Sequence, residues 1–458
     1  MLDTTSQSLL IKNLKDRREK LAQLVEHPII LWSGSPIRRN FSANKYPFRA
    51  SSHFLYFTGI PLADAAIYLY KGRLSLFMDN QPSQAILWHG ESPSRELIGA
   101  MIGAEKVYPL TELTNWTTDV ATIAVQESIT YQDQCRLLGR HIDLSHQSSG
   151  KDLELAQAIV KLRSRHDELA LAELHSAAQV SVQAHKAGMQ ATKQTKTEAA
   201  IRGAMEGIII AHNMSCAYNS IVTVQGEVLH NETYENQLQP GDLLLADVGA
   251  ETVNGWAADI TRTWPVSGKF SSTQRDIYDV VLAAHDRCID EVKPGVEYQD
   301  IHLLAAQIIA EGLVNLGILN GNPQDLVDMD AHALFFPHGI GHLLGLDVHD
   351  MEDLGDLAGY EPDRERSDRF GLGYLRLNRP LASGMLVTIE PGFYQVPAIL
   401  NNQDFRAKYQ DVVNWERLAQ FTDVKGIRIE DDVLVTGSGS EILTVELPTK
   451  IKDIEALV

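Results

Sequence analysis

Apolar residues form short, strand-like runs in the first third of the chain. Two of these runs cover residues 28–34 (PIILWSG) and 65–80, and the pair Lys71-Gly72 divides the second run into two apolar stretches. A turn-forming pair between two such stretches predicts a β-hairpin, and helical patches between the runs favour an α/β domain. The polar, turn-rich segment 144–152 (LSHQSSGKD) marks the end of this domain.

After residue 152 the periodicity changes to that of long amphipathic helices. The first is expected over about 153–190, where apolar residues recur at helical spacing between charges. Further helices are predicted from about 197, at 272–292 and at 298–316, and strands at 242–250, 384–394 and 426–436. The order helix, helix, strand, strand occurs around 155–265 and loosely again around 272–436, which indicates an internal pseudo-repeat. We therefore predict an α/β protein with domains at 1–152 and 153–458.

The size and composition of the chain are those of an ordinary globular protein. Its 458 residues exceed one usual domain, and the shares of 44% hydrophobic and 22% charged residues provide material for a large core. The formal net charge is −20, from 40 Lys and Arg against 60 Asp and Glu. Because proteins bind a phosphate backbone through clustered Lys and Arg, we expect no nucleic-acid partner.

Cysteine usage and the amino-terminal segment indicate a cytoplasmic protein. Cys135, Cys216 and Cys288 are scattered and form no CxxC pair, which favours neither a disulfide framework nor a thiolate zinc site. Residues 1–25 alternate charged and apolar positions, which is typical of an amphipathic helix rather than of a signal peptide. No run approaches the roughly 20 apolar residues that span a bilayer, so we expect no membrane partner.

Five residues of metal-binding type lie inside stretches that we predict to be structured. They are Asp247, Asp259, His342, Glu390 and Glu430. Asp259 lies twelve residues after Asp247, a spacing that a hairpin can bring back opposite it, although either residue alone is more typical of a turn or an edge strand. Carboxylates buried among apolar residues need a compensating cation. Four carboxylates and one imidazole can hold two divalent cations, which favours a dinuclear metallohydrolase.

Further histidines cluster around His342. His338 and His349 lie within the same twelve residues, together with glycines that let the backbone approach a site closely. His338 and His342 are four residues apart, but no Glu completes the HExxH motif, so a zinc protease of that class is excluded. We interpret four other histidines in or beside the predicted helices as surface or packing residues: His166, His175, His185 and His212.

Four sequence blocks resemble the pita-bread metallopeptidases that cleave Xaa-Pro bonds, aminopeptidase P and prolidase. The blocks are D-x-G…D-I-T-R-T, H-G-I-G-H-L-L-G-L-D-V-H-D, T-I-E-P-G-F-Y and G-I-R-I-E-D-D. The resemblance covers about residues 155–450, and residues 46–60 (YPFRASSHFLYFTGI) are similar to the amino-terminal domain of aminopeptidase P. It implies an aminopeptidase P-like α/β domain at 1–152 and a pita-bread, pseudo-twofold catalytic domain at 153–458.

The resemblance assigns a role to each candidate ligand. It implies that Asp247 binds one metal ion, that His342 and Glu390 bind the other, and that Asp259 and Glu430 bridge both. A bridging hydroxide would be the nucleophile, because two cations lower the pKa of a shared water, and Glu390 would be the general base. The oxygen-rich set suits Mn²⁺ best, with Co²⁺ or Zn²⁺ as alternatives.

Other side chains would contact the substrate by the same resemblance. His338 and His349 would stabilise the tetrahedral intermediate or hold the substrate carbonyl, and His230 would contact the proline side. Arg428 would orient Glu430 or bind nearby substrate groups. These assignments extend the predicted site beyond the metal ligands to three histidines and one arginine.

Two aromatic residues leave alternatives open. Tyr394 is expected either to contact the substrate or to pack in the core. Trp88 matches a position that reaches a neighbouring subunit's site in aminopeptidase P, although hydrophobic packing is the favoured interpretation of this residue. Because members of the resembled families are commonly dimers or tetramers, we expect a homo-oligomer.

Together these observations predict a metallo-exopeptidase, a Xaa-Pro aminopeptidase acting on peptides with proline at the second position. Proline requires a special enzyme because its nitrogen has no N–H and its ring restricts the preceding residue. Prolidase, which cleaves Xaa-Pro dipeptides, is the alternative. The intervals of 41 residues from His349 to Glu390 and 40 from Glu390 to Glu430 are long for a compact bacterial aminopeptidase P, and residues 371–385 look more like prolidase.

Two further alternatives are less favoured. Methionine aminopeptidase shares the ligand set but usually lacks so large an amino-terminal domain. A non-catalytic pita-bread module, as in some histone chaperones, or a metal-free relative such as creatinase lacks the full ligand set. All five ligand positions are present in this chain, which favours an enzyme.

Overall fold

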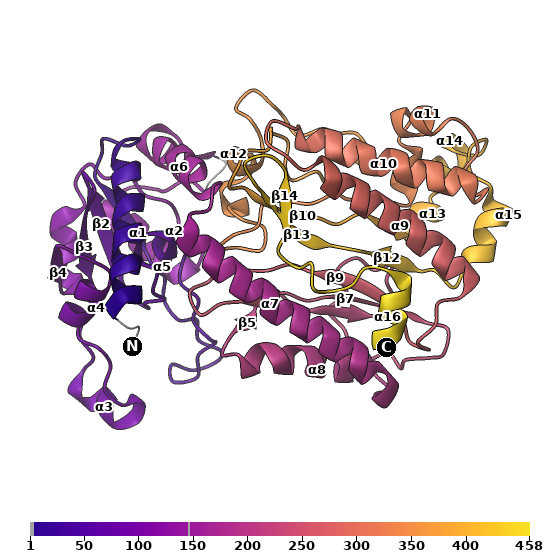
Figure 1. The fold of residues 1–458 in the computed structure, drawn as a ribbon. Coiled ribbons are helices and arrows are strands. Elements are labelled where there is room, and N and C mark those ends of the chain that lie inside the picture. Colours follow the sequence, from indigo (N-terminus) through magenta and orange to yellow (C-terminus); the bar gives the residue numbers. More distant parts are fainter. Residues whose placement is uncertain (1–3, 145–146) are drawn as a thin grey trace. The chain divides into compact units, whose positions relative to one another are not determined.

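The computed structural model describes residues 4–144 and 147–458, which form two compact units (Figure 1). The first unit consists of Met1–Leu169 and the short segments Val253–Gly255 and Met351–Ala358. The second consists of Ala170–Thr252, Trp256–Asp350 and Gly359–Val458. The domain boundary that we expect at residue 152 stays a prediction. No helix among the described residues combines the length and the apolar character needed to cross a bilayer.

The first unit is built on one small sheet. Its strands are β1 (Ile29–Trp32), β2 (Ala66–Tyr70), β3 (Arg73–Phe77) and β4 (Lys106–Tyr108), in that spatial order. The β2–β3 pair is antiparallel, and Lys71 and Gly72 both have positive φ angles, 51° and 76°, as the tight turn between them requires. The predicted hairpin is therefore confirmed.

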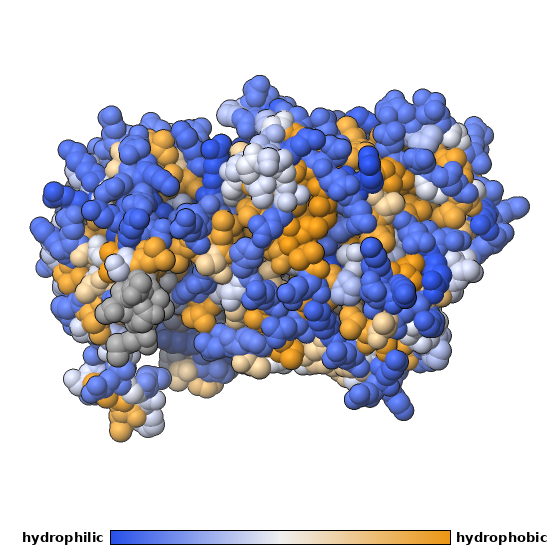
Figure 2. Space-filling model, in the orientation of Figure 1, coloured by the Kyte–Doolittle hydropathy of each residue, from blue (hydrophilic) through white to orange (hydrophobic). Residues whose placement is uncertain are grey.

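Helices surround this sheet. They are α1 (Thr4–Ala22), α2 (Ser52–Thr58), α3 (Ser83–His89), α4 (Arg95–Met101), α5 (Ser128–Leu138), α6 (Gly150–Arg163) and the 3₁₀ helix η1 (Leu110–Trp116). Helix α1 confirms the amphipathic helix predicted at the amino terminus. The expectation that Trp88 packs against other hydrophobic residues is wrong. Leu87 and Trp88 of the short helix α3 are 81% and 78% exposed. Figure 2 shows apolar surface on the part of the molecule that contains α3.

The single long helix predicted over 153–190 is instead two helices. Helix α6 ends at Arg163 and α7 (Glu168–Ala191) begins after four polar residues. The carboxylate of Asp167 accepts hydrogen bonds from Nε and Nη2 of Arg17 at 2.7 and 2.8 Å, which holds the turn between them. Helical periodicity continues through this turn, so the pattern alone does not reveal the break.

The second unit contains two pairs of helices with small sheets between them (Figure 1). One pair is α7 and α8 (Glu198–Ala211), and the other is α9 (Ser272–Glu291) and α10 (Tyr298–Asn315). One three-stranded sheet contains β6 (Ile221–Thr223), β7 (Leu243–Asp247) and β9 (Thr261–Pro265), in that order. The other contains β10 (Leu386–Ile389), β13 (Asp431–Val435) and β14 (Ser440–Ile442), in that order. The two-stranded sheets pair β5 (Ser215–Cys216) with β8 (Ala250–Glu251), and β11 (Gly392–Tyr394) with β12 (Gly426–Arg428).

Shorter helices complete this part of the chain. They are α11 (Pro323–Asp328), α13 (Pro397–Leu400), α14 (Gln403–Lys408), α15 (Trp415–Leu418), α16 (Ile451–Leu457), and the 3₁₀ helices η3 (Thr192–Gln194), η4 (Ala331–Leu334) and η6 (Ala419–Phe421). The first unit also contains the 3₁₀ helix η5 (Glu352–Leu354) and most of α12 (Asp356–Gly359). Helices α13, α14 and α15 lie in the long connection between β11 and β12. The connection is therefore folded rather than an open loop.

Each of the three predicted strand stretches is divided in two. Strand β7 ends before β8, β10 before β11, and β12 before β13. The last two breaks face each other, because Ile389 pairs with Asp431 on one side of the break and Gly392 pairs with Arg428 on the other. This register places Glu390 opposite Glu430 at one interruption of the ladder.

Candidate metal centre

A row of cross-strand positions brings the candidate ligands together. Asp247 at the end of β7 pairs with Thr261 of β9, and Thr261 forms an isolated bridge with Glu430. Glu430 in turn lies opposite Glu390. Opposite residues of antiparallel strands have Cβ atoms about 4.5–5.5 Å apart, so side chains on one face of this row must meet. The predicted carboxylates therefore converge because of strand register, not because of their spacing along the chain.

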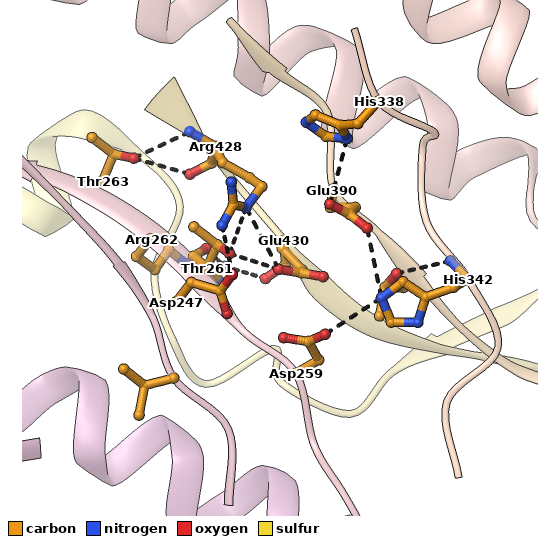
Figure 3. A network of polar contacts seen from close by, with 12 residues as sticks. Asp247, Asp259, Thr261, Arg262, Thr263, His338, His342, Glu390, Arg428 and Glu430 are labelled. Carbon is orange, nitrogen blue, oxygen red and sulfur yellow. Dashed lines mark hydrogen bonds and ion pairs between the residues drawn. The ribbon is translucent and has the colours of Figure 1, made fainter. Parts of the chain in front are cut away.

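Three of the five predicted ligands form a compact buried group (Figure 3). One ligand atom each of Asp259, His342 and Glu430 lies within 4.8 Å of the others. Their relative exposures are 5%, 4% and 2%. Glu390 is adjacent, with Oε1 3.6 Å from Nε2 of His342, and Asp247 is linked to Asp259 through a shared hydrogen-bond partner, the hydroxyl of Tyr218.

The hydrogen bonds of His342 leave one ring nitrogen for a cation. Nδ1 donates to the carbonyl oxygen of Leu343 at 3.0 Å, so in the neutral ring Nε2 carries no proton. Nε2 faces Oδ2 of Asp259 at 3.4 Å and Oε1 of Glu390 at 3.6 Å. A lone pair and two carboxylates repel one another unless a positive ion lies between them. This donor set fits a metal ion.

Burial opposes ionisation of several acids in the group. It raises the pKa of Glu390 to about 8 and that of Asp247 to about 6, and the charge of Asp259 adds to both shifts. Burial and the neighbouring carboxylates also raise the pKa of Glu430 well above its usual range. Such shifts are typical of acids that share a site without enough positive charge. Two divalent cations would supply that charge.

A second layer of hydrogen bonds orients the carboxylates (Figure 3). The guanidinium of Arg428 donates to Oδ2 of Asp247 at 2.5 Å and to the hydroxyl of Thr261 at 2.9 Å. It also donates to the hydroxyl of Tyr394 at 2.9 Å. Thr261 donates to Oε2 of Glu430 at 2.6 Å. Arg428 and Thr261 thus connect two of the predicted metal ligands.

His338 is held by two hydrogen bonds. Nδ1 donates to the carbonyl oxygen of Gly339 at 2.8 Å, and Nε2 lies 2.9 Å from the hydroxyl of Tyr394, which donates to it. Burial, followed by the charge of Arg428, lowers the pKa of His338 to about 3. The ring is therefore neutral. Nδ1 also lies 3.6 Å from Oε2 of Glu390, which places His338 beside the candidate ligands.

The other two predicted histidines lie nearby. The ring of His349 contacts that of His342 edge to face, with ring centroids 4.4 Å apart. His230 is exposed on its loop, and partial burial followed by the charges of Arg428 and Arg376 lowers its pKa. The structure thus places His349 in the candidate centre and His230 within the electrostatic reach of Arg428.

Three residues that the sequence analysis did not assign have clear positions in the centre. They are Tyr218, Thr261 and Arg262. Arg262 is fully buried and donates to the backbone oxygen of Glu430 at 2.7 Å and to Oδ1 of Asp431 at 2.7 Å. Thr261 and Arg262 belong to the D-I-T-R-T block, so the sequence motif could have identified them as residues of the centre. Tyr218 lies in no such block.

Comparison with known proteins gives the family. Residues 172–437 match Metallopeptidase family M24, and residues 14–128 match the Aminopeptidase P, N-terminal domain. A probable Xaa-Pro aminopeptidase of Fusarium vanettenii is 34% identical over 418 residues, which are 90% of this chain and 88% of that protein. The chain belongs to the aminopeptidase P family of M24 metallopeptidases.

Solved structures agree with this assignment. Aminopeptidase P from Escherichia coli with the inhibitor Pro-Leu has a TM-score of 0.79 and 27% identity, and the match covers 98% of each chain. A zinc-substituted form of the same bacterial enzyme in complex with product gives the same values. The expected α/β amino-terminal domain with a pita-bread catalytic domain is confirmed, as is the enzyme class, a metallo-exopeptidase. Membership of this metallopeptidase family implies divalent metal ions.

Proposed function

We propose that this aminopeptidase P family member is a Xaa-Pro aminopeptidase that uses two divalent metal ions. The observation that carries the proposal is the orientation of His342, whose Nδ1 donates to the carbonyl oxygen of Leu343 and whose Nε2 faces Asp259 and Glu390. The Xaa-Pro specificity is taken from the relatives, which are named as aminopeptidases of this kind. The cleaved bond would be the first peptide bond of a peptide with proline second.

Five residues would hold the metal ions. Asp247 would bind one ion, His342 and Glu390 the other, and Asp259 and Glu430 both. When bound, two such ions would lower the pKa of a bridging water, giving a hydroxide nucleophile at neutral pH, and would polarise the scissile carbonyl. The set contains four carboxylates and one imidazole, which suits Mn²⁺ best, with Co²⁺ or Zn²⁺ as alternatives.

Glu390 is our candidate for proton transfer. Its side chain is 15% exposed and lies between two histidines, with one oxygen 3.6 Å from His342 and the other 3.6 Å from His338. It can therefore take a proton from a water inside the centre and pass it to the leaving nitrogen of proline. His349, beside His342, would donate to the oxygen of the scissile carbonyl. His338 could also donate to this oxygen only if it gave up one of its two hydrogen bonds, to Gly339 or to Tyr394.

The substrate contacts remain proposals. His230 would contact the proline side of the substrate, and Tyr394 and Arg428 would line the site next to the metal ligands. The hydrogen bonds of Arg428 to Asp247, Thr261 and Tyr394 support an orienting role more than a direct grip on the peptide. We also propose the domain boundary near residue 152, a homo-oligomer and a cytoplasmic location, with neither nucleic acid nor membrane as partner.

A substrate panel on Mn²⁺-loaded protein tests the proposed function. We expect cleavage of a Xaa-Pro-Xaa tripeptide at the first bond and no cleavage of the matched Xaa-Ala-Xaa tripeptide. The Xaa-Pro dipeptide distinguishes the alternative, prolidase, which the prolidase-like residues 371–385 favour. Turnover of the dipeptide with negligible turnover of the tripeptide would replace the first proposal by the second.

A further inference from the structure

One phenol contacts two of the candidate metal ligands. The hydroxyl of Tyr218 lies 2.6 Å from Oδ1 of Asp247 and 2.6 Å from Oδ1 of Asp259. A hydroxyl has one proton to donate, yet both acceptors are carboxylates that repel each other. The hydroxyl of Tyr218 therefore links these two carboxylates.

Local backbone structure fixes the position of the phenol. Tyr218 lies two residues after β5, which pairs with β8 directly after Gly249, and the N–H of Ala217 donates to the carbonyl oxygen of Gly249 at 2.9 Å. A Cβ on Gly249 would lie 2.9 Å from the Tyr218 ring and 1.8 Å from the carbonyl oxygen of Ala258. Only glycine fits there, so the ring lies directly against the loop that joins the two aspartates.

The remaining oxygens of the two aspartates have other partners. Oδ2 of Asp247 accepts from Arg428, and Oδ2 of Asp259 faces Nε2 of His342. Tyr218 thus sets the rotation of each carboxylate about its bond to the chain. Without the hydroxyl, no hydrogen bond opposes the repulsion between the two Oδ1 atoms, and each carboxylate keeps only the partner of its Oδ2.

We propose that Tyr218 is a positioning residue that holds Asp247 and Asp259 in the arrangement needed to bind a metal ion together, and so sets the affinity of the ion that both contact. This inference rests on the proposed dinuclear centre. It concerns mainly the ion that Asp247 would bind, because both carboxylates that Tyr218 contacts would hold that ion, whereas only Asp259 would also hold the other. Loss of an outer hydrogen bond to a metal ligand typically weakens metal binding by about 10–100-fold.

The test compares Tyr218→Phe with a matched control, Tyr278→Phe. Tyr278 is fully buried in the same unit, and its hydroxyl donates to the carbonyl oxygen of Thr449 at 2.7 Å, so both variants lose one buried hydroxyl. Metal-stripped proteins are titrated with Mn²⁺ in a calorimeter, and the uptake is confirmed by elemental analysis. We expect the site of the ion that Asp247 would bind to weaken by about 10–100-fold in Tyr218→Phe, and the other site, which shares only Asp259 with it among the residues that Tyr218 contacts, to weaken less. Tyr278→Phe should bind both ions as the wild type does.

Each other outcome has a definite meaning. Two wild-type affinities in Tyr218→Phe would overturn the inference while leaving the proposed function intact. Equal weakening in Tyr278→Phe would overturn it as well, because the effect would then follow from general loss of packing. Wild-type protein that takes up fewer than two ions would overturn the dinuclear function and this inference together. At saturating Mn²⁺ the kcat of Tyr218→Phe should return towards the wild-type value, as a positioning role requires.

Discussion

Two buried histidines of the second unit predict how acid destabilises this protein. His302 and His332 are 0% and 1% exposed, and neither ring nitrogen of either residue has a hydrogen-bond partner of normal geometry among the described residues. Burial lowers the pKa of His302 to about 3 and that of His332 to about 4, and the proximity of His332 adds to the first shift and the charge of Arg369 to the second. The backbone of Gly371 acts on the pKa of His302 in the opposite direction without overcoming burial. Both rings are therefore neutral in the folded protein at neutral pH.

The sign of the effect follows from the difference between folded and unfolded states. The unfolded histidines take up protons below about pH 6.5, whereas the folded ones do so only near pH 3–4. The stability they contribute is full above pH 6.5 and is lost as the pH falls towards the folded values. pH 5 lies about 1.5 units below the unfolded pKa, so each histidine has by then reduced the free energy of unfolding by about 2 kcal/mol.

Replacement of His302 by Leu isolates one of these terms. The variant cannot bind a proton at this position, so its unfolding free energy should fall by about 2 kcal/mol less than that of the wild type between pH 7.5 and pH 5. Metal-stripped protein is used for both, so that loss of metal ions at low pH does not contribute. The calorimetric unfolding midpoint of the variant relative to that of the wild type should be about 2 °C higher at pH 5 than at pH 7.5. Parallel pH profiles for the two proteins would refute the reasoning.

Three further predictions concern the centre itself. Glu390→Gln should reduce kcat by about 10²–10⁴-fold while the protein stays folded, whereas Glu311→Gln on the exposed face of α10 should leave kcat unchanged; equal activity of the two variants would exclude Glu390 as the base. Chelation should abolish hydrolysis and lower the midpoint, and Mn²⁺ at 100 times its Kd should restore about 2.7 kcal/mol for each site; full activity after verified metal removal would contradict the metal requirement. Thr261→Val should weaken metal binding by about 10–100-fold in titrations, because it removes the hydroxyl between Arg428 and Glu430. Thr261→Ser should restore binding, and failure of this rescue would point to packing instead.

Much of the fold could be predicted from the pattern of apolar residues. The first hairpin, α1, α8, α9 and α10 all have strong local periodicity, and the structure contains them near the expected positions. The break between α6 and α7 could not be predicted, because it depends on a contact between Arg17 and Asp167 far apart in the sequence. Thr195 lies three residues before Glu198, the spacing of a capping box, yet the cap of α8 is Thr197, whose side chain accepts from the N–H of Ala200.

The candidate ligands could be chosen from the sequence because acids inside apolar strands are costly. Their neighbours were harder to find. Tyr218 lies 29 residues before Asp247 and 41 before Asp259, and no spacing rule connects a tyrosine in a polar loop to either. Only the pairing of β5 with β8 places it beside both aspartates. Trp88 was misjudged because an apolar residue on a seven-residue helix has no periodicity to show which face is covered.

The interruption that separates β10 from β11 and β12 from β13 limits how this chain can change length. Glu390 and Glu430 face each other only while two residues lie between the paired segments on each side. Deletion of one of these residues would shift the register and turn one carboxylate to the opposite face. The connection from β11 to β12, with its three short helices, lies outside this ladder and carries no such restriction. Insertions should therefore be tolerated at the exposed residues 401–404 of this connection, whereas insertions and deletions in residues 386–394 and 426–435 should abolish metal uptake, which a scan scored by metal uptake would reveal.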